Sequence, residues 1–211
     1  MQNDNITWFM IRVLAILLCF PVHESAHAWV AWKLGDPTGK EAGRISLNPL
    51  VHMELWGTLC FLLLGIGYAK PVPVNIGNFR KPKQGFALTA LAGPVSNLIM
   101  ALICLILVKI TYTAGTFLPF YAIVGEGLIY AAYLNVTLAV FNMIPIPPLD
   151  GSRLVTAVLP DRLYGLFLRY ERYSAFALLA VIFLLNRIGI SPVSAASARV
   201  FGVLVRLAGL G

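Results

Sequence analysis

Three long apolar runs dominate the chain, and each is long enough to cross a bilayer as a helix. They cover residues 6–32, 85–110 and 122–144, and a spanning helix needs about 20 predominantly apolar residues. A shorter run at 174–190 has the same character, and the last stretch, 191–211, is apolar but carries two arginines. That stretch is either a final span or an interfacial helix. The pattern predicts an all-α polytopic membrane protein with about four to six transmembrane helices.

The pattern changes between the first two spans. Glycine and proline interrupt residues 36–53, and Arg44-Ile45-Ser46-Leu47 predicts a short membrane-associated β-strand. Residues 55–69 are apolar but too short to span, which predicts a re-entrant or interfacial segment. Basic residues flank this segment on both sides. Because basic loops concentrate on the cytoplasmic side, we expect the segment to enter and leave the membrane from that side.

Composition agrees with a membrane location. The chain of 211 residues is 59% hydrophobic and 12% charged, whereas soluble domains carry about 25% charged residues. The net charge of +7 is explained by basic residues in short loops, so we expect no nucleic-acid partner. The length predicts a single membrane-embedded domain over residues 1–211. The sequence carries no signal for a particular oligomeric state.

The candidate chemistry lies near the end of the first span. His23-Glu24-Ser25-Ala26-His27 matches the pattern His-Glu-x-x-His. Positions i and i+4 share a helix face, so both imidazoles can bind one metal ion, and Glu24 can reach a water beside it. The alternative is a pair of histidines packed in the core, with Glu24 as their hydrogen-bond partner. Buried ionisable groups are costly in lipid and usually functional there, which favours the metal site.

A topology based on charge then identifies candidates for a third ligand. It places the N-terminus outside, and it places both the histidine pair and the end of the third span, with Asp150, near the cytoplasm. His52 is the other candidate, and Asp150 by itself is equally consistent with a turn residue. The shared depth favours Asp150. Asn142, in the third span, either hydrogen-bonds a developing oxyanion or joins helices, and the same two interpretations apply to Asn97.

These residues belong to a series of motifs that resembles a known family. In chain order the motifs are His23-Glu24-x-x-His27, Gly43-Arg44-x-Ser46-Leu47-Asn48-Pro49-x-x-His52, Ala69-Lys70-Pro71-Val72-Pro73-Val74-Asn75, Ala92-Gly93-Pro94-x-x-Asn97 and Phe141-Asn142-x-x-Pro145-x-Pro147-Pro148-Leu149-Asp150-Gly151. Over roughly residues 20–155 the chain resembles the site-2 protease family, the M50-like intramembrane zinc metalloproteases. It looks like a compact bacterial or archaeal member. Such proteins often read His-Ile-Asp-Pro where this chain has His52-Met53-Glu54-Leu55.

The resemblance implies one zinc ion per chain, held by His23, His27 and Asp150. It also implies that Glu24 is the catalytic base and that Asn142 lies near the oxyanion. The catalytic core would then cover about residues 6–155, followed by C-terminal helices at about 156–211.

The resemblance also implies where substrate binds. The loops at 43–52 and 71–75 are expected to form or support the substrate groove, and the residues expected to contribute are Asn48, His52, Asn75 and Asn97. Pairing of an unwound substrate with a short strand from either loop would stabilise its extended form.

The activity implied is zinc-dependent hydrolysis of a peptide bond in or near a transmembrane segment of another membrane protein. By analogy, the substrates are membrane-tethered regulators, cleaved in regulated intramembrane proteolysis, or remnant signal peptides. The protein is expected to be a multi-pass protein of the cell membrane, with its active site toward the cytoplasm. Two alternatives are a metal transporter, which needs ligands spread along a path, and a non-catalytic membrane metal-binding protein, which does not need Glu24.

Overall fold

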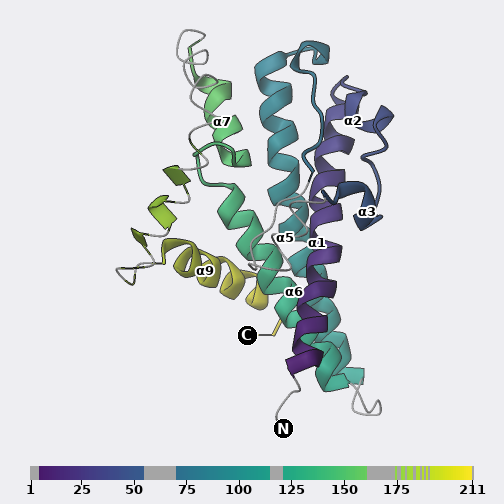
Figure 1. Cartoon of the computed structure of the whole chain (residues 1–211). Coiled ribbons are helices and arrows are strands. Elements are labelled where there is room, and N and C mark those ends of the chain that lie inside the picture. The colour runs from purple at the N-terminus through teal and green to yellow at the C-terminus, as the bar shows by residue number, and fades with distance from the viewer. Residues whose placement is uncertain are drawn as a thin grey trace.

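Three long helices, lying side by side, form the body of the protein (Figure 1). The computed structural model describes residues 5–54, 70–114 and 121–160, and residues 174–210 with gaps. The elements in chain order are α1 (Asn5–Lys33), α2 (Thr38–Glu41), α3 (Pro49–His52), the 3-10 helix η1 (Ile76–Asn78), α5 (Pro82–Ala114), α6 (Tyr121–Asn142), α7 (Asp150–Val158) and α9 (Pro192–Leu207). The described residues form no strand.

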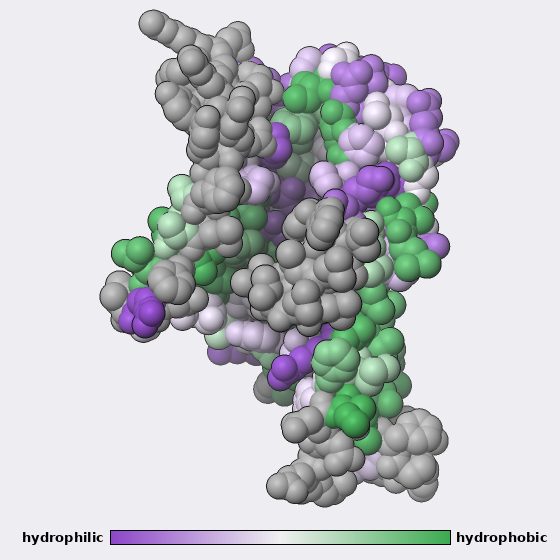
Figure 2. Space-filling model, in the orientation of Figure 1, coloured by the Kyte–Doolittle hydropathy of each residue, from purple (hydrophilic) through white to green (hydrophobic). Residues whose placement is uncertain are grey.

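The first three predicted spans are confirmed as helices. α1 has 29 residues, α5 has 33 and α6 has 22. At about 1.5 Å of rise per residue, each is longer than the hydrocarbon core of a bilayer, which is about 30 Å thick. By length and composition all three can cross a membrane. Figure 2 shows hydrophobic residues along the N-terminal half of α1 and hydrophilic residues gathered over α2.

The C-terminal helix α9 differs from the three spans. It has 16 residues, fewer than the roughly 20 that a spanning helix needs. It packs against α6 and α5 and runs across the direction of the long helices (Figure 1). Of the two alternatives for residues 191–211, the structure therefore disfavours a final span. Of the predicted fourth span, 174–190, the structure describes ten residues, nine of which are helical, and the other seven lie outside the described set.

The apolar core lies where α5, α6 and α9 meet. Its buried members are small or medium-sized and include Ala101, Leu105, Ala132, Val136 and Ala208. Alanine at these positions allows the helix backbones to approach closely, which is how spanning helices gain packing contacts in a medium that offers no hydrophobic driving force. This core holds the far halves of α5 and α6 together.

The prediction of a short strand at 44–47 is wrong. These residues have no regular structure, because side chains form hydrogen bonds with the backbone groups that would otherwise pair with a neighbouring strand. The Ser46 N–H donates to Ser25 Oγ, 3.1 Å away, and the Ser46 carbonyl accepts from His52 Nε2 at 2.8 Å. Ser25 belongs to α1, so the segment is tied to that helix beside Glu24. The predicted re-entrant segment at 55–69 lies outside the described residues.

A buried carboxylate joins the end of α1 to the segment that leads into α5. Asp36 is fully buried, and it accepts hydrogen bonds from the Thr38 hydroxyl, the Asn78 side chain and the Asn75 backbone N–H. Burial raises the pKa of Asp36, but the hydrogen bonds from Thr38, Asn78 and Asn75 lower it by more than burial raises it. The pKa of Asp36 therefore lies below its usual value. An ionised Asp36 thus fixes the chain on both sides of residues 37–74.

Candidate metal centre

One turn of α1 supplies two of the candidate ligands. His23 and His27 lie four residues apart on the same face, and their exposed fractions are 7% and 8%. Their Nε2 atoms are 3.0 Å apart. Both rings therefore point into the bundle and toward one point, as the i and i+4 spacing predicts.

The third candidate ligand arrives on a different helix. Asp150 is the first residue of α7, which follows a tight turn after α6. Gly151 makes the turn possible, because a Cβ there would lie 2.3 Å from the carbonyl oxygen of Met143. The close approach of backbone to backbone leaves no room for a side chain. α7 packs on α5, and this contact brings Asp150 to the histidines on α1.

The three ligand atoms form a nearly equilateral triangle. Asp150 Oδ2 lies 3.2 Å from His23 Nε2 and 3.3 Å from His27 Nε2. The ligand atoms of a tetrahedral zinc ion, each about 2.0–2.1 Å from the metal, lie about 3.3 Å apart. Asp150 Oδ2 is buried and accepts no hydrogen bond from the described residues. Of the described residues, these three form the one group of histidine, cysteine, aspartate and glutamate side chains able to hold a metal.

Hydrogen bonds at the far side of each imidazole point Nε2 at the metal position. His27 Nδ1 lies 2.7 Å from the carbonyl oxygen of Thr89, which can only accept. Nδ1 therefore carries the proton, and the neutral ring presents a lone pair at Nε2. The Thr89 carbonyl thus fixes both the orientation and the tautomer of His27.

Asn97 does the same for His23. Its amide lies 3.1 Å from His23 Nδ1, and the side chain is completely buried. The amide oxygen has no hydrogen-bond partner among the described residues in the present orientation. A half-turn of the amide exchanges its oxygen and nitrogen, so that Oδ1 accepts from Nδ1–H and His23 Nε2 is left with a lone pair. Asn97, which the sequence placed in a substrate groove or a support role, lies behind a candidate ligand.

Gly93, between these two partners on α5, gives the imidazoles their space. A Cβ at Gly93 would lie 2.4 Å from His27 Nε2 and 2.5 Å from His23 Cε1. Any side chain there would displace the ligands. Gly93 belongs to the motif Ala92-Gly93-Pro94-x-x-Asn97 but was given no role from the sequence, and the Thr89 carbonyl was not singled out. A glycine within a spanning helix is a signal for close approach.

Glu24 lies beside the triangle without belonging to it. Its side chain is partly exposed, and its carboxylate accepts no hydrogen bond from the described residues. A carboxylate next to a metal centre, with no structural partner, is available to exchange a proton with a water.

Three of the other predicted site residues have structural contacts of their own. His52 is buried and bonded to the Ser46 carbonyl at 2.8 Å, and it does not join the metal group. Asn48 caps α3 through Leu50 N–H, and Asn75 caps η1 through Gly77 N–H. Asn142 is the last residue of α6, and its side chain makes no hydrogen bond to another described residue. The structure therefore favours Asp150 over His52 as the third ligand.

Comparison with known proteins agrees with this geometry. Residues 121–185 match Peptidase family M50. Over 173 residues the chain is 38% identical to "Putative zinc metalloprotease YwhC" of Bacillus subtilis, covering 81% of this chain and 78% of that protein. It is 31% identical over 154 residues to "Putative zinc metalloprotease MJ0611" of Methanocaldococcus jannaschii, covering 72% of this chain and 73% of the relative.

A third relative is longer. "Putative zinc metalloprotease Rip2" of Mycolicibacterium smegmatis is 31% identical over 148 residues, which are 68% of this chain but 55% of that protein. No solved structure matches the chain. The extent of the match to YwhC, together with a buried two-histidine, one-aspartate centre, shows that the chain belongs to Peptidase family M50 and is a zinc metalloprotease of the site-2 protease type.

Proposed function

We propose that this protein is an intramembrane endopeptidase whose zinc ion is held by His23, His27 and Asp150. The observation that carries the proposal is the convergence of the three ligand atoms, 3.0–3.3 Å apart, at a buried point on helices that can span a bilayer. Two neutral imidazoles and one carboxylate leave the fourth position of a tetrahedral ion open, as in catalytic zinc sites. All of residues 1–211 would form one protease domain.

The chain's own groups then account for the movement of protons. When bound, zinc acidifies a water and polarises the scissile carbonyl. Glu24 accepts the proton of the attacking water as its oxygen bonds to the carbonyl carbon. It then delivers this proton to the amide nitrogen as the carbon–nitrogen bond breaks. The Asn142 amide, at the end of α6 and without a partner among the described residues, would donate to the oxyanion.

The segment 70–75 supports an extended mode of substrate binding. A helical substrate hides its carbonyls in its own hydrogen bonds and has to unwind before attack. Pro71 and Pro73 keep the preceding residues out of the helical region. Val72 and Val74 retain N–H groups, and these donate to no described residue. Alternate residues of an extended chain face one edge, so the donors lie along a single edge.

A substrate strand would therefore pair with this segment along one edge only. The prolines have no N–H groups to donate at the opposite edge. Asp36 fixes the end of the segment by accepting from the Asn75 N–H at 2.8 Å. The segment would thus hold an unwound transmembrane peptide in one direction past the metal centre.

Charge supports an active site toward the cytoplasm of a cell-membrane protein. The end of α1 and the start of α5 lie at the same end of the bundle (Figure 1), and Lys33, Arg80 and Lys81 lie there. Basic residues mark the cytoplasmic face. A metal transporter would need ligands distributed along the spans, whereas the candidate ligands of the described residues form one cluster.

Glu24→Gln is the direct test. The amide keeps the shape of the side chain but cannot accept the proton. We therefore expect cleavage of a model transmembrane substrate to fall by about 10²–10⁴-fold, with one zinc still bound per chain. Glu41→Gln, an exposed glutamate of α2, is the matched control and should cleave normally. A zinc-loaded Glu24→Gln protein that cleaves at the wild-type rate would contradict the assignment, and a chelator should abolish wild-type cleavage.

A further inference from the structure

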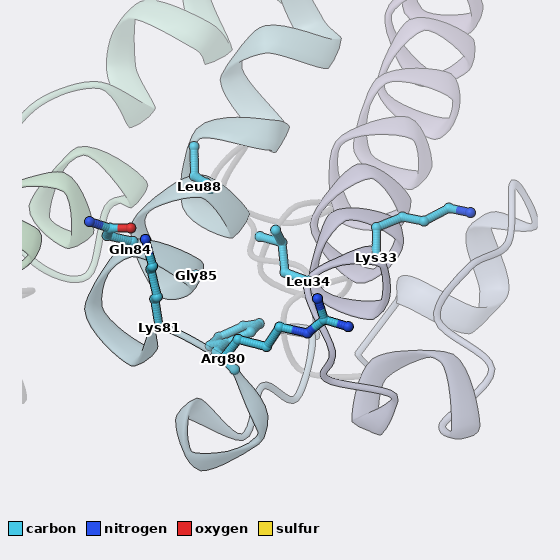
Figure 3. Close-up of a pocket in the computed structure, with 8 residues that line it drawn as sticks. Lys33, Leu34, Arg80, Lys81, Gln84, Gly85 and Leu88 are labelled. Atoms are coloured by element: carbon cyan, nitrogen blue, oxygen red, sulfur yellow. The ribbon is translucent and has the colours of Figure 1, made fainter.

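A second hollow lies between the end of α1 and the beginning of α5, apart from the metal centre (Figure 3). Its volume is about 280 Å³, near the lower limit of small-molecule pockets, which is about 300 Å³. The lining residues are Lys33, Leu34, Phe79, Arg80, Lys81, Gln84, Gly85 and Leu88. None of them is acidic.

The outer part of this pocket is positively charged. Arg80 and Lys81 are exposed, and neither side chain makes a hydrogen bond or an ion pair with another described residue. α5 begins directly after them, and the first N–H groups of a long helix lack intrahelical acceptors and carry the positive end of its dipole. Lys33 contributes less, because its ammonium lies 4.5 Å from the Trp32 ring centroid and points away from the pocket (Figure 3).

The inner part is apolar. Leu88 lies two turns into α5, in the direction of the bilayer interior, and it is 50% exposed. Leu34, at the end of α1, faces the same hollow (Figure 3). Charged groups at the membrane boundary with apolar groups below them match a phospholipid, whose phosphate lies above its acyl chains.

The fold also fixes the backbone that carries the two cations. Phe79 is buried, and its ring covers Gly85, where a Cβ would lie 2.5 Å from the ring. This contact fixes the turn that carries Arg80 and Lys81 against α5. The pocket is thus formed before any ligand binds, which lowers the entropic cost of binding.

We propose that this pocket binds the headgroup phosphate of an anionic phospholipid, with Arg80 and Lys81 as its charged contacts and Leu34 and Leu88 against its acyl chains. The site is independent of the proposed protease chemistry. It would anchor the end of α1 that carries the histidine pair at a fixed depth in the bilayer.

The test measures lipid retention by the purified full chain in a neutral detergent, using native mass spectrometry with phosphatidylglycerol or phosphatidylcholine. Each basic residue near a membrane surface contributes about 1 kcal/mol to the binding of anionic lipid. Arg80→Gln with Lys81→Gln should therefore weaken phosphatidylglycerol binding at least tenfold and leave phosphatidylcholine unaffected. Zinc content is measured in every sample and should not change, so the result does not depend on the protease assignment.

The matched control removes two charges elsewhere. Lys40→Gln with Lys70→Gln changes two exposed lysines that do not line the pocket, and it should bind phosphatidylglycerol as the wild type does. Equal weakening by both pairs would overturn the proposal, because it would show a general effect of charge. Displacement of the lipid by the same concentration of soluble glycerol phosphate would also overturn it, because the site would then be one for free phosphate.

Discussion

The metal centre and the apolar core share α5, but they are held together in different ways. The core at Ala101, Leu105 and Val136 consists of aliphatic side chains that contact several neighbours each. At the metal centre, the Nδ1 atom of each imidazole has a single partner, which is the Thr89 carbonyl for His27 and the Asn97 amide for His23. When one contact in the core is lost, the side chain keeps its contacts with other neighbours. When a polar atom of the metal centre loses its hydrogen-bond partner, no other group can replace that partner. The two regions should therefore differ in what a single substitution changes.

Asp150→Ala should have the largest effect on the metal centre. It removes one of three ligands, so we expect zinc to be lost in purification and cleavage to fall below detection. Metal content measured by mass spectrometry checks this. Leu105→Ala, in the core, is the contrasting variant. It should lower the thermal unfolding midpoint by leaving a cavity while one zinc per chain is retained. Unchanged zinc content in Asp150→Ala would point to another ligand.

Gly93→Ala should have the next largest effect. The added Cβ would overlap His27 Nε2, and a displacement of catalytic groups by about 1 Å can cost about 10²-fold in rate. We expect kcat/KM to fall by about this factor and zinc affinity to fall with it. Gly202→Ala is the control, because no atom lies within 4 Å of its added methyl. It should leave kcat/KM unchanged; a similar loss in both variants would show that the effect is not steric.

Asn97→Leu should have the smallest effect of the three. It removes the partner that orients His23 and keeps a similar volume. Loss of such a partner typically lowers metal affinity by about 10–100-fold. Asn135→Leu is the matched control, since Asn135 is an equally buried asparagine of α6 that donates to Cys19 Sγ and the Ala131 carbonyl. In a competition assay with a zinc chelator, the zinc affinity should be lower for Asn97→Leu and unchanged for Asn135→Leu. Equal zinc affinities would contradict the positioning role.

Sequence reasoning found the parts of this molecule that depend on local pattern. Lipid demands long apolar helices, so hydropathy located α1, α5 and α6. The i and i+4 spacing predicted that His23 and His27 share one helix face, and the positive-inside rule predicted that Asp150 lies at the same depth in the membrane. The geometry confirms that these three converge.

The parts that it missed depend on contacts between distant segments. Gly93 matters because α5 passes close to the α1 histidines, and no local pattern reports that distance. Residues 44–47 have strand-like sequence, but the Ser25 side chain takes the backbone N–H of Ser46. His52 was a plausible ligand until its bond to the Ser46 carbonyl was known.

The place of Asp150 after the third span has a consequence for the synthesis of the protein. A nascent chain that has not yet reached α7 presents the two imidazoles without the Asp150 carboxylate, so its capacity to hold zinc is incomplete. The chain completes the centre only after α1, α5 and α6 have been made and α7 has packed against α5. The order of the helices thus delays hydrolytic activity until the core of the enzyme is assembled, and an unfinished chain cannot cut its neighbours.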